Sequence, residues 1–480
     1  MALTREVMVD RFLARDPAYE LRFVVGVVTT GIYCVPTCSA RKPKESNVRF
    51  FATLDDARRA GLRACKRCRP DHVHAGRDPE REALEAAVTA LRRSPGDFRG
   101  VGDVARAAGC GATKLGELVR EHYHTTPRAL LVAARLRFAR RELMETNRRV
   151  LSIAVDAGFE GATAFHDNFR RALGLAPGEY RSMGRSGELA LRLPRGYPVE
   201  HLLRSLGRDP EGRTERVRGR TLARAIRVDG RPARVTVELK AGAARGRVEA
   251  RSRLTPAAVG EAHEVLLRVL GLTIDPAPFE RRARGDVELT RLIEGRRGVR
   301  IPQTPNAFEG LVWSIVGQQV NLAFAFTCRN RLIDLAGTRA GDRLTAHPTP
   351  EAVAGLDYVD LTRLQYSQRK AEYLIDTSHL IAAGELDLEG LAHASATRAY
   401  ETLASVRGLG PWSVNYMLMR SLGFADCVPV GDAGLVRALQ EFHDLPSRPG
   451  PDETLALMER YSPHRSLATF HLWKTLGDPT

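Results

Sequence analysis

Four cysteines near the start of the chain have the spacing of a metal site. Cys34 and Cys38 form a C-x3-C pair, and Cys65 and Cys68 form a C-x2-C pair. Two such pairs place four thiolates around one ion, which is the arrangement of structural zinc sites. The other three of the seven cysteines are scattered, so a disulfide framework explains the pattern less well. We therefore predict one Zn²⁺ bound by four cysteines.

A zinc site of this kind has chemistry of its own. A zinc-bound thiolate remains nucleophilic, and four thiolates around Zn²⁺ carry a formal charge of about −2. Alkylation of one sulfur gives a neutral thioether and halves that charge, so the centre could act as a switch. Basic residues surround the cysteines, and we expect four of them to contact DNA: Arg41, Lys42, Lys66 and Arg67. A purely structural zinc knot is the alternative.

The composition of the whole chain favours a polyanionic partner. The 480 residues include 73 Lys and Arg against 57 Asp and Glu, a net charge of +16. Counterion release makes nucleic acid the leading partner for such a chain, and the length suits about three domains. The start, MALTREVMVDRF, lacks a continuous apolar segment, and no run of about 18 apolar residues follows. These features predict a cytoplasmic protein without a membrane partner.

Elements that position DNA contacts follow the cysteine-rich part. GATKLGELVREHYHTTPRAL at 111–130 returns as GATAFHDNFRRALGLAPGEY at 161–180, an offset of 50 residues, and a short Ala-rich helix ending in Gly precedes each copy. The pattern predicts two helix-turn-helix units whose second helices, at about 112–122 and 162–172, enter the major groove. A plain helical bundle is the alternative.

The remaining sequence changes pattern twice. Residues 189–290 contain alternating stretches such as ARVTVELKA, which predict antiparallel strands with turns at 229–230 and 241–246. From Pro305 onward the patterns are almost entirely helical. Within that part Gly408-Leu409-Gly410 predicts a hairpin between two helices, whose backbone N–H groups can approach a DNA phosphate.

Three stretches resemble known families. RFVVGVVTTGIYCVPTCSARKPKESNVRFF with GLRACKRCRPD resembles the amino-terminal domain of Ada adaptive-response proteins, over residues 1–76. That resemblance implies that Cys34 irreversibly takes a methyl group from a DNA methylphosphotriester, while the other three cysteines keep the zinc. Residues 77–185 resemble AraC-type DNA-binding domains, with Gly158-Phe159 and a closing P-x-x-Y-R from Pro177 to Arg181.

Residues 189–480 resemble 3-methyladenine DNA glycosylase II enzymes of the helix-hairpin-helix superfamily. The landmarks are NAFEGLVWSIVGQQV, SPHRSLATFHLW and an aspartate, Asp432, 22 residues after Gly410. The resemblance implies that Asp432 stabilises an oxocarbenium-like sugar and that Gly408, Gly410 and Gln319 contact DNA. Trp412 and Tyr416 would stack on the extruded base. A helix cap for Asp432 and core packing for the two aromatic residues are the alternatives.

Two positions depart from the family pattern. His464 stands where relatives commonly have Trp, and Gln318-Gln319 occupies the loop where an apolar wedge is usual. Trp412 takes the place of the Schiff-base lysine of bifunctional members, so a monofunctional glycosylase without lyase activity is expected. No reactive Pro-Cys-His-Arg motif occurs, so O6-methylguanine transfer is not expected.

Together these features predict a multidomain alkylation-repair and adaptive-response protein. The parts are a small zinc-bound α/β domain (1–76), an all-α double helix-turn-helix domain (77–185), an α+β subdomain (189–300) and an all-α helix-hairpin-helix glycosylase domain (301–480). Double-stranded, alkylated and promoter DNA are the expected partners, with RNA polymerase if the protein is an activator. One alternative is a zinc-containing transcription regulator with an inactive glycosylase part; another is a sensor that only enriches the glycosylase on damaged DNA.

Overall fold

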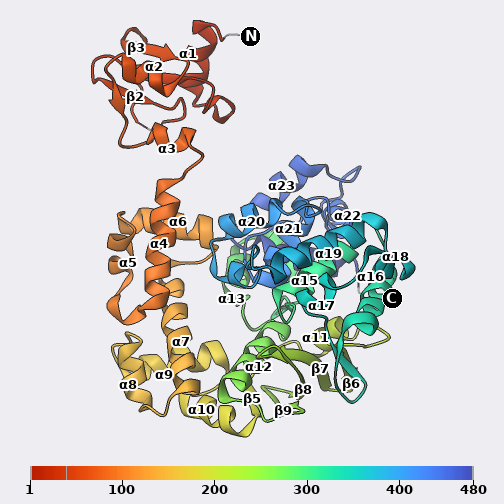
Figure 1. Cartoon of the computed structure of the whole chain (residues 1–480). Helices are drawn as coiled ribbons and strands as arrows, with labels where there is room; N and C mark the ends of the chain where they lie inside the picture. Colours follow the sequence, from red (N-terminus) through yellow and green to blue (C-terminus); the bar gives the residue numbers. More distant parts are fainter. Residues whose placement is uncertain (1–2, 39, 478–480) are drawn as a thin grey trace. The chain divides into compact units, whose positions relative to one another are not determined.

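The computed structural model describes residues 3–38 and 40–477, which divide into two compact units (Figure 1). The first unit comprises residues 1–87 with 107–109, and the second comprises 88–106 with 110–480. Helix α4 (Pro79–Arg93) runs from one unit into the other. No helix among the described residues combines the length and apolar composition that crossing a bilayer requires.

The first unit is a four-stranded sheet with three helices, which agrees with the predicted small α/β domain. The strands are β1 (Val24–Val27), β2 (Ile32–Cys34), β3 (Val48–Phe51) and β4 (Arg63–Ala64), in the order β3-β1-β2-β4. The helices are α1 (Arg5–Ala14), α2 (Leu54–Arg59) and α3 (Pro70–His74). β1 is antiparallel to β2 and β3, whereas β2 and β4 are parallel. Parallel strands end at the same edge of a sheet, so β2 and β4 bring the residues that follow them together.

The second unit begins with the helical repeat. The helices are α5 (Val101–Ala107), α6 (Ala112–Tyr123), α7 (Pro127–Glu145), α8 (Val150–Asp156), α9 (Ala162–Leu173) and α10 (Pro177–Ser186). The predicted second helices of the two units are therefore α6 and α9. Each buries one apolar face, with Leu115 and Leu118 on α6 and Phe165 and Phe169 on α9, and exposes the other.

A five-stranded antiparallel sheet follows, as the alternating patterns predicted. It consists of β5 (Glu188–Arg192), β6 (Glu215–Arg218), β7 (Thr221–Val228), β8 (Arg231–Lys240) and β9 (Ala243–Ala250), in the order β5-β9-β8-β7-β6. The turn at 229–230 is confirmed, but β9 already begins at Ala243, so the second predicted turn was too long. Gly246 lies within β9, where a Cβ would sit 1.8 Å from the carbonyl oxygen of Thr236. Close strand packing, and not a turn, explains this glycine.

The second helix-turn-helix unit and this sheet share one hydrophobic core. Phe165, Phe169 and Tyr180 belong to the same cluster as Leu189 and Leu266, which lie in β5 and in α12 (Pro256–Val269). Helix α10 packs on α12, and the two lie beside the sheet (Figure 1). The predicted domain boundary at 185–189 therefore separates two patterns in the sequence but not two cores.

The rest of the chain is a helical domain. Its elements are α11 (Val199–Leu206) beside the sheet, then α13 (Ala277–Arg282), α14 (Val287–Ile293), α15 (Ala307–Val316), α16 (Leu322–Ala336), α17 (Pro350–Ala354), α18 (Tyr358–Arg363), α19 (Gln368–Ala382), α20 (Ala396–Ala404), α21 (Pro411–Met417), α22 (Ala433–Phe442), α23 (Pro451–Glu459) and α24 (Arg465–Thr475). A short hairpin, β10 (Thr338–Gly341) with β11 (Leu344–Ala346), interrupts the helices. The helical pattern did not predict it, because strands of three or four residues are too short to show an alternation.

Candidate metal centre and candidate catalytic cavity

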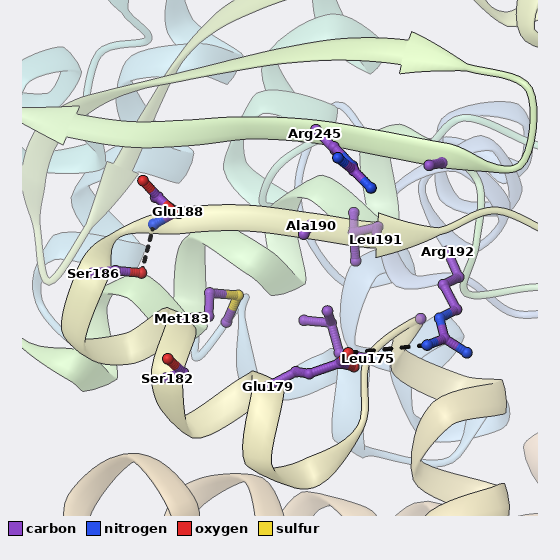
Figure 2. Close-up of a pocket in the computed structure, with 12 residues that line it drawn as sticks. Leu175, Glu179, Ser182, Met183, Ser186, Glu188, Ala190, Leu191, Arg192 and Arg245 are labelled. Carbon is purple, nitrogen blue, oxygen red and sulfur yellow. Dashed lines mark hydrogen bonds and ion pairs between the residues drawn. The ribbon is translucent and has the colours of Figure 1, made fainter.

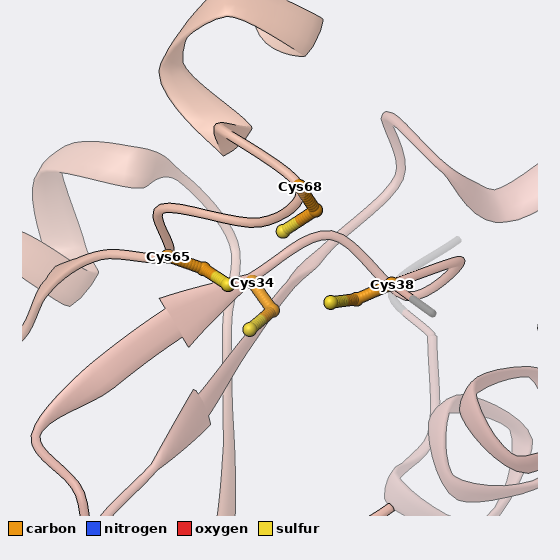
Figure 3. Close-up of side chains that lie close together, drawn as sticks. All are labelled: Cys34, Cys38, Cys65 and Cys68. Atoms are coloured by element: carbon orange, nitrogen blue, oxygen red, sulfur yellow. The ribbon is translucent and has the colours of Figure 1, made fainter. Parts of the chain in front are cut away.

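The four predicted metal ligands converge at one edge of the first sheet (Figure 3). Cys34 ends β2 and Cys65 directly follows β4, and the amide of Cys65 donates to the carbonyl of Tyr33 at 2.9 Å. Cys38 lies in the loop after β2, and Cys68 lies just before α3. The four sulfur atoms lie within 4.8 Å of one another, a spacing that suits the four corners of a Zn²⁺ tetrahedron.

The protonation of these thiols shows why a cation fits. Hydrogen bonds from Cys34 and Cys68 lower the pKa of Cys38, whereas the hydrogen bonds that Cys34 makes to Cys38 and Cys68 raise the pKa of Cys34. Four thiolates at this distance require a bound cation, because each added negative charge is repelled by the others.

The basic residues around the cysteines are placed differently. Arg41, Lys66 and Arg67 are exposed beside the metal ligands. The ammonium of Lys42 instead lies 3.6 Å from the ring centre of Phe12 and donates to the backbone carbonyls of Phe12 and Pro36. Burial lowers the pKa of Lys42 to about 8, and the charge of Arg15 acts in the same direction. DNA contact by Lys42 stays a prediction, and its ammonium also ties the end of α1 to the cysteine loop.

A cavity of about 600 Å³ lies in the second unit between the sheet and the helical domain. Three predicted site residues line it: Trp412, Tyr416 and Asp432. All three tryptophans of the chain line it, and its aromatic residues are Trp313, Phe326, Trp412, Tyr416, Phe470 and Trp473. Trp313 and Trp473 were not predicted as site residues, although both stand in the two landmark stretches of the sequence, and the rarity of tryptophan could have singled them out.

Asp432 is held in this cavity by three donors. The indole Nε1 of Trp412 donates to Oδ2 at 2.9 Å, and that of Trp473 donates to Oδ1 at 2.8 Å. The backbone amide of Leu435 also donates to Oδ1, at 2.7 Å, so Asp432 is the N-cap of α22. Asp432 is therefore a helix cap, as the alternative interpretation expected, and it also lines the cavity; its catalytic role stays a prediction. The cap and the two indoles fix the carboxylate in one orientation.

The aromatic rings beside Asp432 form a stacking surface. The rings of Trp412 and Tyr416 have centroids 5.5 Å apart, and those of Tyr416 and Trp473 are 6.3 Å apart. None of the three side chains is fully buried. A planar base that enters the cavity can therefore contact ring faces close to a fixed carboxylate.

The predicted hairpin joins α20 to α21. Gly408 has φ +92°, and a Cβ there would lie 2.3 Å from the ring of Tyr373, so only glycine fits. Gly410 is the exposed N-cap of α21, with open space around it. Gln318 links this hairpin to the loop between α15 and α16, because its Nε2 donates to the carbonyl of Gly408 at 2.9 Å. The neighbouring Gln319 is exposed and has a left-handed backbone (φ 53°).

Paired charges form the wall of the cavity on the side of the sheet. Arg224 lies 3.1 Å from Glu309 and 3.4 Å from Glu215, and Arg329 lies 3.2 Å from Glu215. Burial alone would raise the pKa of Glu215, but the two guanidinium groups lower it to about 2. These long-range pairs hold the sheet against the helices and so keep the cavity in shape.

A second hollow of about 340 Å³ lies between α10 and β5 (Figure 2). Its charged residues, such as Glu179 and Arg192, are exposed and lie 3.9 Å apart at the surface. Surface pairs of this kind are weak, so we place the candidate chemistry in the larger cavity.

Family comparisons match each part of this architecture. Residues 8–71 match the metal binding domain of Ada, residues 104–183 match a helix-turn-helix domain, and residues 312–464 match the HhH-GPD superfamily of base excision DNA repair proteins. A probable bifunctional transcriptional activator/DNA repair enzyme AlkA from Mycobacterium tuberculosis is 30% identical over 97% of this chain and 95% of its own length. The chain belongs to this bifunctional family.

Two partial matches support the same division. The bifunctional transcriptional activator/DNA repair enzyme Ada of Escherichia coli is 30% identical over 40% of this chain and 52% of its own length. A 3-methyladenine DNA glycosylase structure from Archaeoglobus fulgidus covers 61% of this chain and 100% of its own, with a TM-score of 0.54 and 22% identity, which shows a common fold. As a member of the bifunctional family, the chain combines an Ada-type centre of four cysteines and one Zn²⁺ with a DNA glycosylase domain.

Proposed function

We propose that this protein removes alkylated bases such as 3-methyladenine from DNA and senses methylphosphotriesters through Cys34. The glycosylase part hydrolyses the N-glycosidic bond of the damaged nucleotide, and Asp432 is the catalytic residue. The sensor part accepts one methyl group per molecule and thereby strengthens promoter binding. The observation that supports the first activity best is the Asp432 carboxylate, fixed by two indole N–H groups inside an aromatic cavity.

The cavity suits a cationic leaving base. Alkylation at N3 or N7 gives the purine a positive charge, so the glycosidic bond needs little further activation. The faces of Trp412 and Tyr416 attract such a ring through cation–π contact. The carboxylate of Asp432 then faces the positive charge that develops on the sugar, and water completes the hydrolysis.

Substitution Asp432→Asn tests this role. Asparagine caps a helix as well as aspartate does, so the fold should hold while the negative charge is lost. We expect release of 3-methyladenine to fall about 100- to 1000-fold, and binding to undamaged DNA to stay nearly unchanged. Asp432→Ser, which also keeps a cap, should behave alike. Unchanged base release in both variants would return Asp432 to a purely structural role.

We also propose that the glycosylase is monofunctional. Trp412 occupies the place of the lyase lysine, and the lysine that lines the cavity, Lys474, donates to Ser205 at 3.2 Å. The product should be an abasic site that persists until alkali is added. Borohydride treatment during the reaction checks this expectation, because a trapped covalent adduct would contradict it. Loss of the adduct in a Lys474→Met variant would then identify the amine.

In the sensor, the Sγ of Cys34 attacks the methyl carbon of the phosphotriester. The C–O bond breaks, its electron pair stays on the phosphate oxygen, and Cys34 becomes a neutral thioether. A Zn²⁺ ion held by Cys34, Cys38, Cys65 and Cys68 would keep the sulfur nucleophilic at neutral pH. Exposed Arg41, Lys66 and Arg67 lie near the four sulfurs and can hold the DNA backbone.

Methylphosphotriester DNA and peptide mass spectrometry test the sensor. We expect one added methyl, on Cys34, once per molecule, and one Zn²⁺ per chain before the reaction. Removal of the metal by a chelator should abolish the transfer. A methyl on Cys65 or Cys68, or repeated turnover, would refute the assignment.

Promoter DNA, and RNA polymerase if the protein activates transcription, are the further partners that we propose.

A further inference from the structure

Arg420 belongs to the group of side chains that line the cavity around Asp432. Its guanidinium carbon lies 5.9 Å from the ring centres of both Tyr416 and Phe470. Phe470 in turn lies 6.3 Å from Trp473. Trp412 and Trp473 connect this group to Asp432, because both donate hydrogen bonds to its carboxylate. Arg420 and Asp432 thus contact different members of this aromatic group, and both line the same cavity.

The fold places the guanidinium of Arg420 against the rings of Tyr416 and Phe470. Its Nε has no hydrogen-bond partner, and among residues 3–38 and 40–477 no carboxylate pairs with it. Three other cavity-lining arginines are paired with acids: Arg224 with Glu309 at 3.1 Å, Arg329 with Glu215 at 3.2 Å, and Arg437 with Glu441 at 2.7 Å. An arginine beside aromatic rings without an acid partner has donors to offer to a ligand.

The backbone that carries Arg420 is rigid. Residues Leu418–Leu422 form a π-helical turn that continues α21, a feature frequent at functional sites. The amide of Thr304 donates to the carbonyl of Arg420 at 2.9 Å. Gly310 packs directly on this turn, since a Cβ there would lie 1.7 Å from the hydroxyl of Ser421. These contacts present Arg420 to the cavity in a set position.

A purine can enter the cavity with its sugar at Asp432 and the edge farthest from the glycosidic bond toward Arg420, because both residues line this cavity. Guanidinium groups only donate hydrogen bonds. At position 6 of the purine, guanine-derived bases offer an acceptor, O6, whereas adenine-derived bases offer an amino donor, N6.

We propose that Arg420 is a specificity-determining residue that donates hydrogen bonds to O6 of guanine-derived lesions, such as 7-methylguanine, in the base cavity. This inference rests on the proposed glycosylase activity. Both 7-methylguanine and 3-methyladenine are cationic in DNA, so the charge of Arg420 repels both alike. The ratio of the two release rates therefore isolates the hydrogen bond.

Single-turnover release of the two bases by the full-length chain tests the proposal. Arg420→Met should slow release of 7-methylguanine about tenfold or more, while release of 3-methyladenine changes by less than about threefold. Arg420→Lys keeps the charge but loses the forked donors, so it should show a smaller loss in the same direction. Arg437→Met is the matched control, and any change that it causes should affect both bases equally.

Three other results would overturn the inference. Equal slowing of both bases in Arg420→Met, with a lowered Tm, would give Arg420 a structural role. Equal slowing at unchanged Tm would assign it to a phosphate of the DNA. Unchanged rates for both bases would remove it from recognition. Absence of any base release by the unsubstituted protein would instead refute the proposed glycosylase function itself, which separates the two failures.

Discussion

At the scale of single residues, the hydrogen-bond donors around Asp432 predict how a substitution at Trp473 affects base release. Trp473→Phe keeps an aromatic ring in the cavity but removes the N–H that donates to Oδ1 at 2.8 Å. The carboxylate should then lose part of its fixed orientation, and release of 3-methyladenine should slow about tenfold. Single-turnover base release measures this effect.

Trp313→Phe provides the matched control. Trp313 lines the same cavity, but its ring packs against Phe326, with centroids 5.0 Å apart, whereas the indole donors to Asp432 are Trp412 and Trp473. Its substitution should therefore slow the reaction less than Trp473→Phe does. A larger effect at Trp313 would show that stacking outweighs the orientation of the carboxylate.

At the scale of elements, the stability of the core shared by α9, α10, α12 and the sheet should depend on pH. His263 in α12 is fully buried, its Nε2 lies 3.0 Å from the carbonyl of Leu173, and burial lowers its pKa to about 3. The unfolded chain binds a proton at His263 below about pH 6.5, whereas the folded chain does not. The contribution of buried, neutral His263 to folding stability is therefore fully present above about pH 6.5, and it is lost as the pH drops toward 3.

Thermal unfolding of the full-length chain between pH 7 and pH 5 measures this dependence. The contribution of His263 should approach about 1.4 kcal/mol per pH unit below its unfolded pKa. His263→Gln should flatten the slope, whereas substitution of the exposed His379 should leave it unchanged. An equal slope in His263→Gln and the unsubstituted chain would show that other groups control the acid sensitivity.

At the scale of the whole molecule, the proposed switch joins the metal centre to the helix-turn-helix part. Methylation of Cys34 removes one negative charge from a centre near DNA phosphates. Two charges 4 Å apart near a protein surface interact by up to about 4 kcal/mol, so promoter affinity should rise about tenfold or more. Binding to operator DNA before and after methylation, at low and high salt, measures the change.

High salt should weaken this gain, because it screens the repulsion that methylation relieves. Cys34→Ser cannot accept a methyl from the phosphotriester as the thiolate does, so its promoter affinity should not respond to methylated DNA. Equal affinity before and after methylation at low salt would leave the metal centre with a structural role alone.

The sequence alone determined those features that depend on neighbours along the chain. Paired cysteines identified a metal site because each pair needs only a short turn, and apolar periodicity identified α6 and α9 because a helix buries one face. The turn at 229–230 and the hairpin at Gly408 followed from local backbone preferences. The order of these elements along the chain could therefore be predicted.

Tertiary structure alone decided what meets across long separations. Trp473 reaches Asp432 from 41 residues away, and Arg224 reaches Glu309 from 85 residues away. Only packing shows that Arg420 lines the cavity, that Gly246 serves a close strand contact, and that the second helix-turn-helix unit shares a core with the sheet. The physical reason is that burial and hydrogen bonding act between surfaces, and a residue type does not record which surface it will face.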